Sequence, residues 1–132
     1  MATPPARSIV FAAAAGFTAV ATGAFGAHAL HPLLAANGRV ETWQTAVLYH
    51  LIHAVALLAI ALFLHRETDP ARLRRSARSA DLFAAGIVLF SGSLYARALG
   101  APTWLWPVTP LGGCCFLAGW LAIGHALWPR KS

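Results

Sequence analysis

The sequence predicts an all-α fold, an integral membrane four-helix bundle, and three observations lead to it. Of the 132 residues, 58% are hydrophobic and 11% are charged, whereas a water-soluble domain carries about a quarter charged residues. Four long stretches contain no Asp, Glu, Lys or Arg, namely 9–30, 42–64, 82–96 and 107–128. The basic residues all lie outside these stretches, and most of them fall on one side if the stretches cross a membrane alternately. In lipid a backbone must satisfy its own hydrogen bonds, so such stretches become helices.

The first, second and fourth stretches are long enough to cross a bilayer, because a hydrocarbon core of about 30 Å needs about 20 helical residues. The third reaches this length by continuing past Arg97, whose long side chain can extend to the interface. The first apolar run is longer than the roughly 7–15 residues of a signal peptide, so we expect it to be retained as a span. We predict one domain, 1–132, with spans at about 8–30, 42–64, 81–99 and 107–128.

Turn residues mark the ends of these spans. A proline inside a helix removes a hydrogen bond and clashes with the preceding turn, and every proline avoids the middle of a span. Pro32 is expected to end the first helix, and Pro70 is expected to lie in a basic loop over 65–81. Asn37 and Gly38 predict a turn before the second span.

The basic residues predict the orientation of the chain. If the spans alternate, only Arg39 and Arg97 of the ten Lys and Arg residues fall on the second side. The positive-inside rule then places both termini and the 65–81 loop in the cytoplasm, an N-in/C-in topology. The same bias explains the net charge of +6 without a nucleic-acid partner. The expected surroundings are the lipid bilayer, with a membrane-protein partner or a homo-oligomer left open. The eight residues on the first side are Arg7, Arg66, Arg72, Arg74, Arg75, Arg78, Arg130 and Lys131.

Small residues predict how the helices pack. In lipid, small side chains drive association because they let helix backbones approach closely. The first span carries an unbroken seam of such residues at steps of four and three, and the third and fourth spans carry shorter ones. Trp43, Trp104 and Trp106 are expected to form an aromatic belt at the outer interface. The predicted helix-packing glycines are Gly16, Gly23, Gly26, Gly92, Gly112 and Gly119.

Polar side chains inside the spans are the candidate functional residues. Such groups are costly in a membrane, so each one calls for a reason. Most of them lie in the outer halves of the spans, which suggests a polar layer that holds the helices together or binds a ligand. The members are His28, Gln44, Tyr49, His50, His53, Ser93, Tyr95, Arg97 and Thr109.

His50 and His53 share a helix face, since they are three residues apart. Three interpretations stay open for them: hydrogen bonds across helices or to interfacial water, a ligand or proton site, and haem or metal ligation. Haem is disfavoured because its second histidine would have to match the first in depth, and His28 lies about two to three turns shallower than His53. A metal needs a third or fourth ligand, and the four uncharged stretches contain no acidic residue. We therefore predict no metal and no cofactor.

Sequence motifs of common enzymes are missing from the chain. It contains no GxSxG, Walker, HExxH or CxxC motif, and no pair of carboxylates lies in a span to act as general acid and base. We expect a protein that is not an enzyme. Cys114 and Cys115 are adjacent in the fourth span and are interpreted as small apolar residues of the core.

Several segments in order along the chain resemble one family. They are Gly23-Ala-Phe-Gly-Ala-His28, Trp43-Gln-Thr-Ala-Val-Leu-Tyr-His50, Leu89-Phe-Ser-Gly-Ser-Leu-Tyr95, and Thr109-Pro-Leu-Gly-Gly113 with Gly119-Trp120. The resemblance is to the YgdD-like small membrane proteins, the family of the domain of unknown function 423. It implies a four-span protein of the bacterial inner membrane and implies no reaction.

Two hypotheses about function follow. The first is a non-enzymatic structural, accessory or assembly component of the membrane. The second is a ligand-binding or transport module that uses the polar layer to take a proton, an anion, a quinone or a haem.

Overall fold

The computed structural model of the chain describes residues 4–128, with side chains from Arg7 onward. All regular structure in this part of the chain is helical, and four helical segments are long and apolar enough to cross a membrane. The all-α fold with four candidate spans is therefore confirmed. The elements are α1 (Pro4–Ala27), α2 (His31–Ala36), α3 (Val40–Arg66), α4 (Pro70–Gly86), the π-helical turn η1 (Ile87–Ser91), α5 (Gly92–Ala98), the 3-10 turn η2 (Thr103–Leu105) and α6 (Val108–Leu127).

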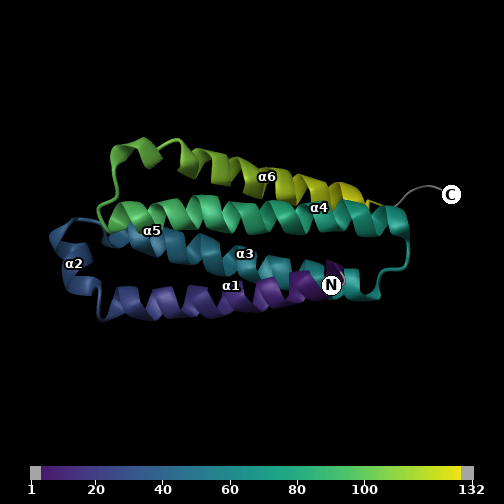
Figure 1. Cartoon of the computed structure of the whole chain (residues 1–132), viewed down its shortest axis with the longest axis horizontal. Helices are drawn as coiled ribbons and strands as arrows, with labels where there is room; N and C mark the ends of the chain where they lie inside the picture. Colours follow the sequence, from purple (N-terminus) through teal and green to yellow (C-terminus); the bar gives the residue numbers. More distant parts are fainter. Residues whose placement is uncertain (1–3, 129–132) are drawn as a thin grey trace.

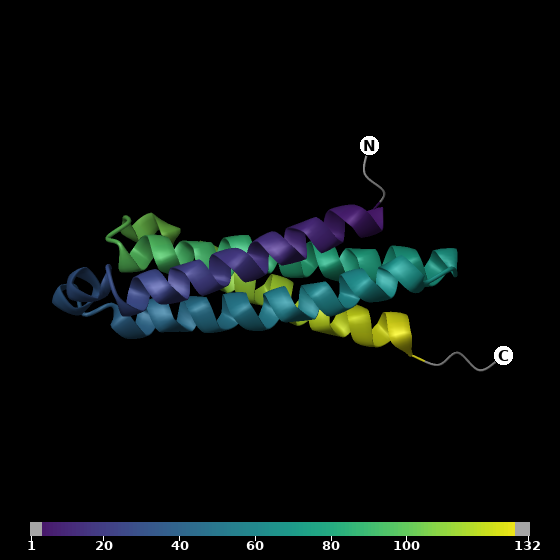
Figure 2. The same cartoon turned by 90° about the horizontal axis from the view of Figure 1, so that it is seen from below.

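The long helices run side by side as two hairpins. In the first hairpin α1 packs along α3, and in the second α6 packs along α4 and η1. The hairpins meet where α3 crosses α4, η1 and α5, which form one continuous rod from residue 70 to residue 98. Figures 1 and 2 show that α1 begins and α6 ends at the end of the bundle where α3 connects to α4. We call this the inner end; α2 and η2 lie at the opposite, outer end (Figure 1).

The expected basic loop over 65–81 is wrong for most of its length, because α4 begins at Pro70. Pro70 occupies the first turn, where a missing N–H costs nothing, and the Asp69 carboxylate caps the helix by accepting from the Ala71 N–H at 2.9 Å. Ser76 and Ser79 are fully buried on one face. The many arginines of this segment led to the prediction of a loop, but the segment forms an amphipathic helix that extends the third span at its inner end.

The other span limits differ little from those predicted. The first helix ends at Ala27 rather than at residue 30, and Pro32 lies in the first turn of α2 instead of ending a span. The second and fourth helices, residues 40–66 and 108–127, match the expected spans within two residues. The turn at Gly38 has a φ of 62°, a left-handed conformation that favours glycine.

Two expectations about individual side chains are wrong. Trp43 is 5% exposed and belongs to a buried cluster with Leu34 and Ala98, so it does not join an aromatic belt. Its indole N–H donates to the Thr22 carbonyl at 2.9 Å, which holds α3 against α1. Cys114 is exposed on α6, outside the core. Trp104 and Trp106 are exposed at the outer end.

The glycines divide into close and open positions. A Cβ on Gly112 would collide with the backbone of Phe90, and one on Gly26 would collide with the Trp43 indole. At Gly119 a Cβ would lie 2.7 Å from the Phe83 ring, and at Gly23 it would lie 3.3 Å from Val47 Cγ1. In contrast, apart from the backbone of the glycine's own helix and its chain neighbours, no atom lies within 4 Å of such a position at Gly16 or Gly92, so neither glycine faces another helix closely. A close glycine that the sequence patterns missed is Gly86, which faces Phe116.

Candidate functional site

The first polar cluster surrounds His50 and connects three helices. His50 lies on α3 and is 6% exposed. Its Nδ1 is 3.2 Å from the Tyr95 hydroxyl on α5, and its Nε2 is 3.4 Å from the Thr18 hydroxyl on α1. The Tyr95 hydroxyl is also 2.9 Å from the Thr22 hydroxyl, one turn further along α1. A chain of hydrogen bonds therefore starts and ends on α1 and passes through both of the other helices.

The hydrogens of this cluster have two complete arrangements. In the first, Thr18 donates to the Ala14 carbonyl at 2.8 Å, His50 donates from Nε2 to Thr18 Oγ1, and Nδ1 accepts from Tyr95. In the second, Thr22 donates to the Thr18 carbonyl at 2.9 Å and accepts from Tyr95. His50 Nδ1 then donates to Tyr95 Oη, and Nε2 accepts from Thr18. Both ring nitrogens of the neutral imidazole have a partner either way.

The second polar cluster surrounds His53, one turn deeper on α3. Its Nδ1 lies 2.8 Å from the Tyr49 carbonyl, which only accepts, and its Nε2 lies 3.2 Å from the Trp120 indole N–H, which only donates. The two partners therefore fix the neutral tautomer with the hydrogen on Nδ1. The ring stacks on Phe116 with centroids 3.5 Å apart and planes 12° apart. This cluster connects α3 with α6.

The remaining predicted residues do not join either cluster. Ser93 and Thr109 form a separate buried pair, with hydroxyl oxygens 2.7 Å apart, between α5 and α6. Arg97 lies over the Trp106 ring at 5.1 Å, a cation–π contact at the outer end. His28 and Gln44 are exposed. The nine predicted residues therefore form several separate contacts rather than one pocket.

Three residues of the two clusters were missed in the sequence. Thr18 and Thr22 are four residues apart, so they share a face of α1, and this spacing is the signal that would have found them. Trp120 was noted only as part of a motif. Ser79 was also missed, because it falls in the stretch expected to be a loop; its hydroxyl donates to the Gly119 carbonyl at 2.7 Å and fastens α4 to α6.

The described residues contain no group of three or more His, Cys, Asp or Glu side chains that could hold a metal ion. His50 and His53 lie on one helix, and every ring nitrogen already has a protein partner. To ligate a metal or a haem iron, either histidine would have to give up one of these hydrogen bonds. What the arrangement does is hold α1, α5 and α6 at fixed positions along α3.

Comparison with known proteins places these contacts in a family context. The family model described as "Protein of unknown function (DUF423)" matches residues 22–113, which include His50, His53 and Tyr95. The chain belongs to the DUF423 family.

Relatives in the DUF423 family resemble this chain over nearly its whole length. The UPF0382 inner membrane protein YgdD of Escherichia coli is 44% identical over 128 residues, which cover 93% of this chain and 92% of YgdD. A UPF0382 membrane protein of Haemophilus influenzae is 39% identical over 127 residues, which cover 96% of this chain and 97% of the relative. The UPF0382 membrane protein YwdK of Bacillus subtilis is 36% identical over 115 residues, which cover 87% and 90%. No solved structure matches.

Proposed function

We propose that this DUF423 protein is a non-enzymatic accessory or assembly component of the inner membrane, with an interior polar layer that is structural. The single observation that carries the proposal is that all four ring nitrogens of His50 and His53 are within hydrogen-bonding distance of groups of the chain itself. A ring nitrogen that already has a protein partner has to exchange that hydrogen bond before it can bind a substrate or ligand directly.

The chemistry of the layer supports this role. Between helices in lipid, polar side chains act as specific contacts because the hydrophobic effect supplies no force there. The His50 cluster fixes α1 and α5 against α3, and the His53 cluster fixes α6. Each hydrogen bond between helices joins two particular helices at one depth, so the layer favours one arrangement of the bundle.

The outward faces support an accessory role. Apolar side chains cover the outside of α6, where Leu117 and Leu121 are 68% and 76% exposed, and of α1, where Phe17 is 74% exposed. In the membrane these faces meet lipid, or the helices of a partner protein or of a second copy. We propose a partner for them without assigning its identity.

We also propose that both ends of the chain face the cytoplasm. Arg7 starts the first candidate span, and Arg66 and the arginines of α4 lie at the same end of the bundle. Among the Lys and Arg residues that the structure describes, only Arg39 and Arg97 lie toward the outer end. This distribution is what the positive-inside rule requires for an N-in/C-in topology.

The proposal is tested by native mass spectrometry of the full chain extracted in mild detergent, together with its visible spectrum. We expect a protein partner or a second copy to be retained equally by the wild type and by His50→Ala, without a Soret band. The control is His65→Ala, because His65 is exposed at the inner end of α3. A small molecule bound stoichiometrically to the wild type and lost in His50→Ala would contradict the proposal and favour the ligand-binding module.

A further inference from the structure

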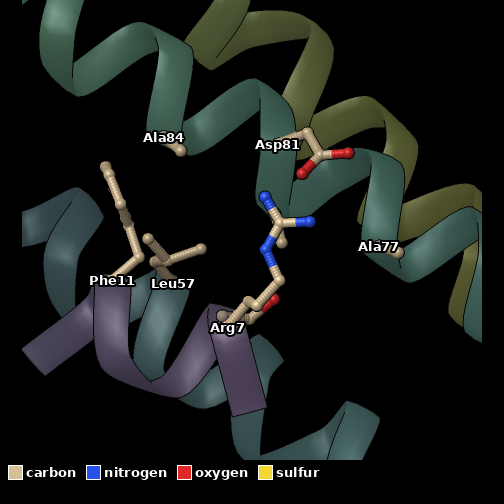
Figure 3. Close-up of a pocket in the computed structure, with 8 residues that line it drawn as sticks. Arg7, Phe11, Leu57, Ala77, Asp81 and Ala84 are labelled. Atoms are coloured by element: carbon tan, nitrogen blue, oxygen red, sulfur yellow. The ribbon is translucent and has the colours of Figure 1, made fainter. Parts of the chain in front are cut away.

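A groove opens between α1 and α4 near the inner end of the bundle, and neither His50 nor His53 lines it (Figure 3). Its cavity has a volume of about 370 Å³. Leu57 of α3, 1% exposed, contributes to its apolar lining, and Phe11 lines it from α1. On α4 the lining residues are Ala77, Ala80 and Ala84, whose spacing places them on one face of the helix. Because the side chains of these three alanines are single methyl groups, they leave the groove open, whereas larger side chains at the same positions would fill it.

Two opposite charges face each other across the opening of this groove. The Arg7 guanidinium extends from α1 toward α4, and the Asp81 carboxylate lies on α4 opposite to it (Figure 3). Within the described residues the only ion pair is between Arg72 and Glu67, at 3.9 Å. Arg7 and Asp81 therefore face the same space without forming an ion pair.

The opening of the groove is expected to lie at the level of the lipid headgroups. The uncharged stretch of the first span begins at Ile9, directly after Arg7 and Ser8, and α1 continues to Ala27. At 1.5 Å per residue this part of the helix covers nearly the whole hydrocarbon core, which is about 30 Å thick. Arg7 therefore lies where hydrocarbon gives way to headgroups. The lining below it, with Phe11 and Leu57, lies at the level of the acyl chains.

From this geometry we propose that the groove is a binding site for a phospholipid that carries both a phosphate and a primary ammonium group, namely phosphatidylethanolamine. The phosphate pairs with Arg7, the ammonium donates to Asp81, and one acyl chain lies along the alanine face of α4. An anionic headgroup would pair with Arg7 but would be repelled by Asp81. A quaternary ammonium has no N–H to donate to the carboxylate. The inference does not depend on the proposed accessory role, because it concerns only the lipid next to one groove.

The test uses the delipidated full chain in mild detergent, titrated with phospholipids of identical acyl chains and followed by native mass spectrometry. The headgroups are ethanolamine, its mono-, di- and trimethylated derivatives, and glycerol. We expect the ethanolamine lipid to bind about tenfold more tightly than the trimethylated and glycerol lipids, as one charge-assisted hydrogen bond predicts. The affinity should fall as methyl groups replace the N–H donors. This series needs no substitution, so it remains decisive if a variant fails to fold.

Two substitutions separate the two halves of the headgroup. Asp81→Asn should remove the preference for ethanolamine over its trimethylated form, and Arg7→Gln should weaken all these lipids about tenfold by removing the phosphate partner. The matched controls are Asp69→Asn and Arg78→Gln, exposed positions on the inner side that do not line the groove. Asn also serves as an N-cap, so Asp69→Asn preserves the start of α4.

The proposal is overturned if the wild type binds the ethanolamine and trimethylated lipids equally, or if a folded Asp81→Asn variant keeps the preference. It is also overturned if the wild type binds no lipid more tightly than the Arg7→Gln and Asp81→Asn double variant. That last result would mean that Arg7 and Asp81 close the groove by pairing directly with each other.

Discussion

At the scale of residues, the two interior histidines have different surroundings although they are neighbours on one helix face. His50 belongs to a chain of hydrogen bonds with hydroxyl groups, in which donor and acceptor can exchange roles. His53 has fixed roles, because its Nδ1 faces a carbonyl that only accepts and its Nε2 faces an indole N–H that only donates. The stacked contact with Phe116 adds a further restriction to the His53 ring. His53 is therefore the more rigid of the two contacts, and His50 can adjust its hydrogens without losing a partner.

Removing the indole donor at position 120 should show how much the His53 contact contributes. Trp120→Phe keeps an aromatic ring but leaves His53 Nε2 as a buried acceptor without a partner. We expect a loss of about 1 kcal/mol in the free energy of unfolding, within the range for interhelical hydrogen bonds in membranes. The measurement is reversible unfolding in mixed detergent micelles. Trp104→Phe is the control, because Trp104 is 71% exposed. Equal stability of both variants would argue that the His53–Trp120 bond is not formed.

The hydroxyl of Tyr95 should matter more, because it contacts both His50 and Thr22. Tyr95→Phe removes both bonds at once and leaves a buried imidazole nitrogen without its partner, so we expect a loss of about 1–3 kcal/mol. Tyr49→Phe is a matched control, since Tyr49 takes part in the polar layer only through its carbonyl. The same unfolding experiment compares the two. A larger loss in Tyr49→Phe would contradict the described cluster.

The sequence predicted the histidines of the site but only some of their partners. His50 and His53 were placed on one inward face because their spacing on a single helix decides this. Thr18 and Trp120 come from other helices, and which residues meet across helices depends on the rotation and sliding of each helix about its axis. Spacing along one chain segment carries no information about either, so Ser93 and Thr109 were grouped with the histidines although they pair with each other.

At the scale of elements, the limits of α3 and α6 lie within two residues of the predicted spans, because charged residues and prolines mark where such helices end. The inner part of α4 was not predicted, because outside the membrane a helix no longer needs an uncharged sequence. Its N-terminal signal was present in the Asp69–Pro70 pair, an N-cap followed by proline. The short α2, His31–Ala36, was also missed; it lies between the end of the first predicted span and the predicted turn at Asn37 and Gly38.

Two glycine substitutions test the packing between elements. Gly112→Ala places a methyl group against the backbone of Phe90, so α6 must move away from η1, and we expect a loss of about 1–3 kcal/mol. Gly16→Ala places the same group in open space on α1, so stability should stay equal or rise slightly, as alanine favours helix over glycine. The measurement is again unfolding in micelles. A loss in Gly16→Ala as large as that in Gly112→Ala would contradict the packing described here.

At the scale of the whole molecule, charge distribution predicts how the bundle lies in the membrane. Arginines gather at the inner end, and α4 carries four of them, Arg72, Arg74, Arg75 and Arg78, on a helix that continues the third span. The bundle is therefore electrically polarised along its axis. Such a polarised bundle is expected to insert in one orientation.

Reporter fusions test this orientation. We expect a fluorescent reporter fused after Ser132 or inserted beside Thr68 to be active in the cytoplasm, and a periplasm-dependent phosphatase inserted beside Asn37 to be active outside. Neutralising the four arginines of α4 should produce a mixture of orientations, because topology follows the excess of Lys and Arg near the span ends. Activity of the phosphatase at Thr68 but not at Asn37 would reverse the proposed topology.

The π-helical turn η1 changes how every residue after it must be counted. A π turn bonds residue i to residue i+5, so it holds one residue more than an α turn, and this extra residue rotates the following helix by about 100°. A seam traced by α-helical steps from Ala85 through Leu89 to Gly92 crosses this turn, so its residues do not keep to one face of the rod. Deleting one residue from Ile87–Ser91 would turn Tyr95 away from His50 while α4 kept its place. The continuous rod from residue 70 to residue 98 therefore consists of two helical segments that are rotated relative to each other about the rod axis. Residues after η1 that share a face with residues before it are found by adding one residue to the usual α-helical spacing.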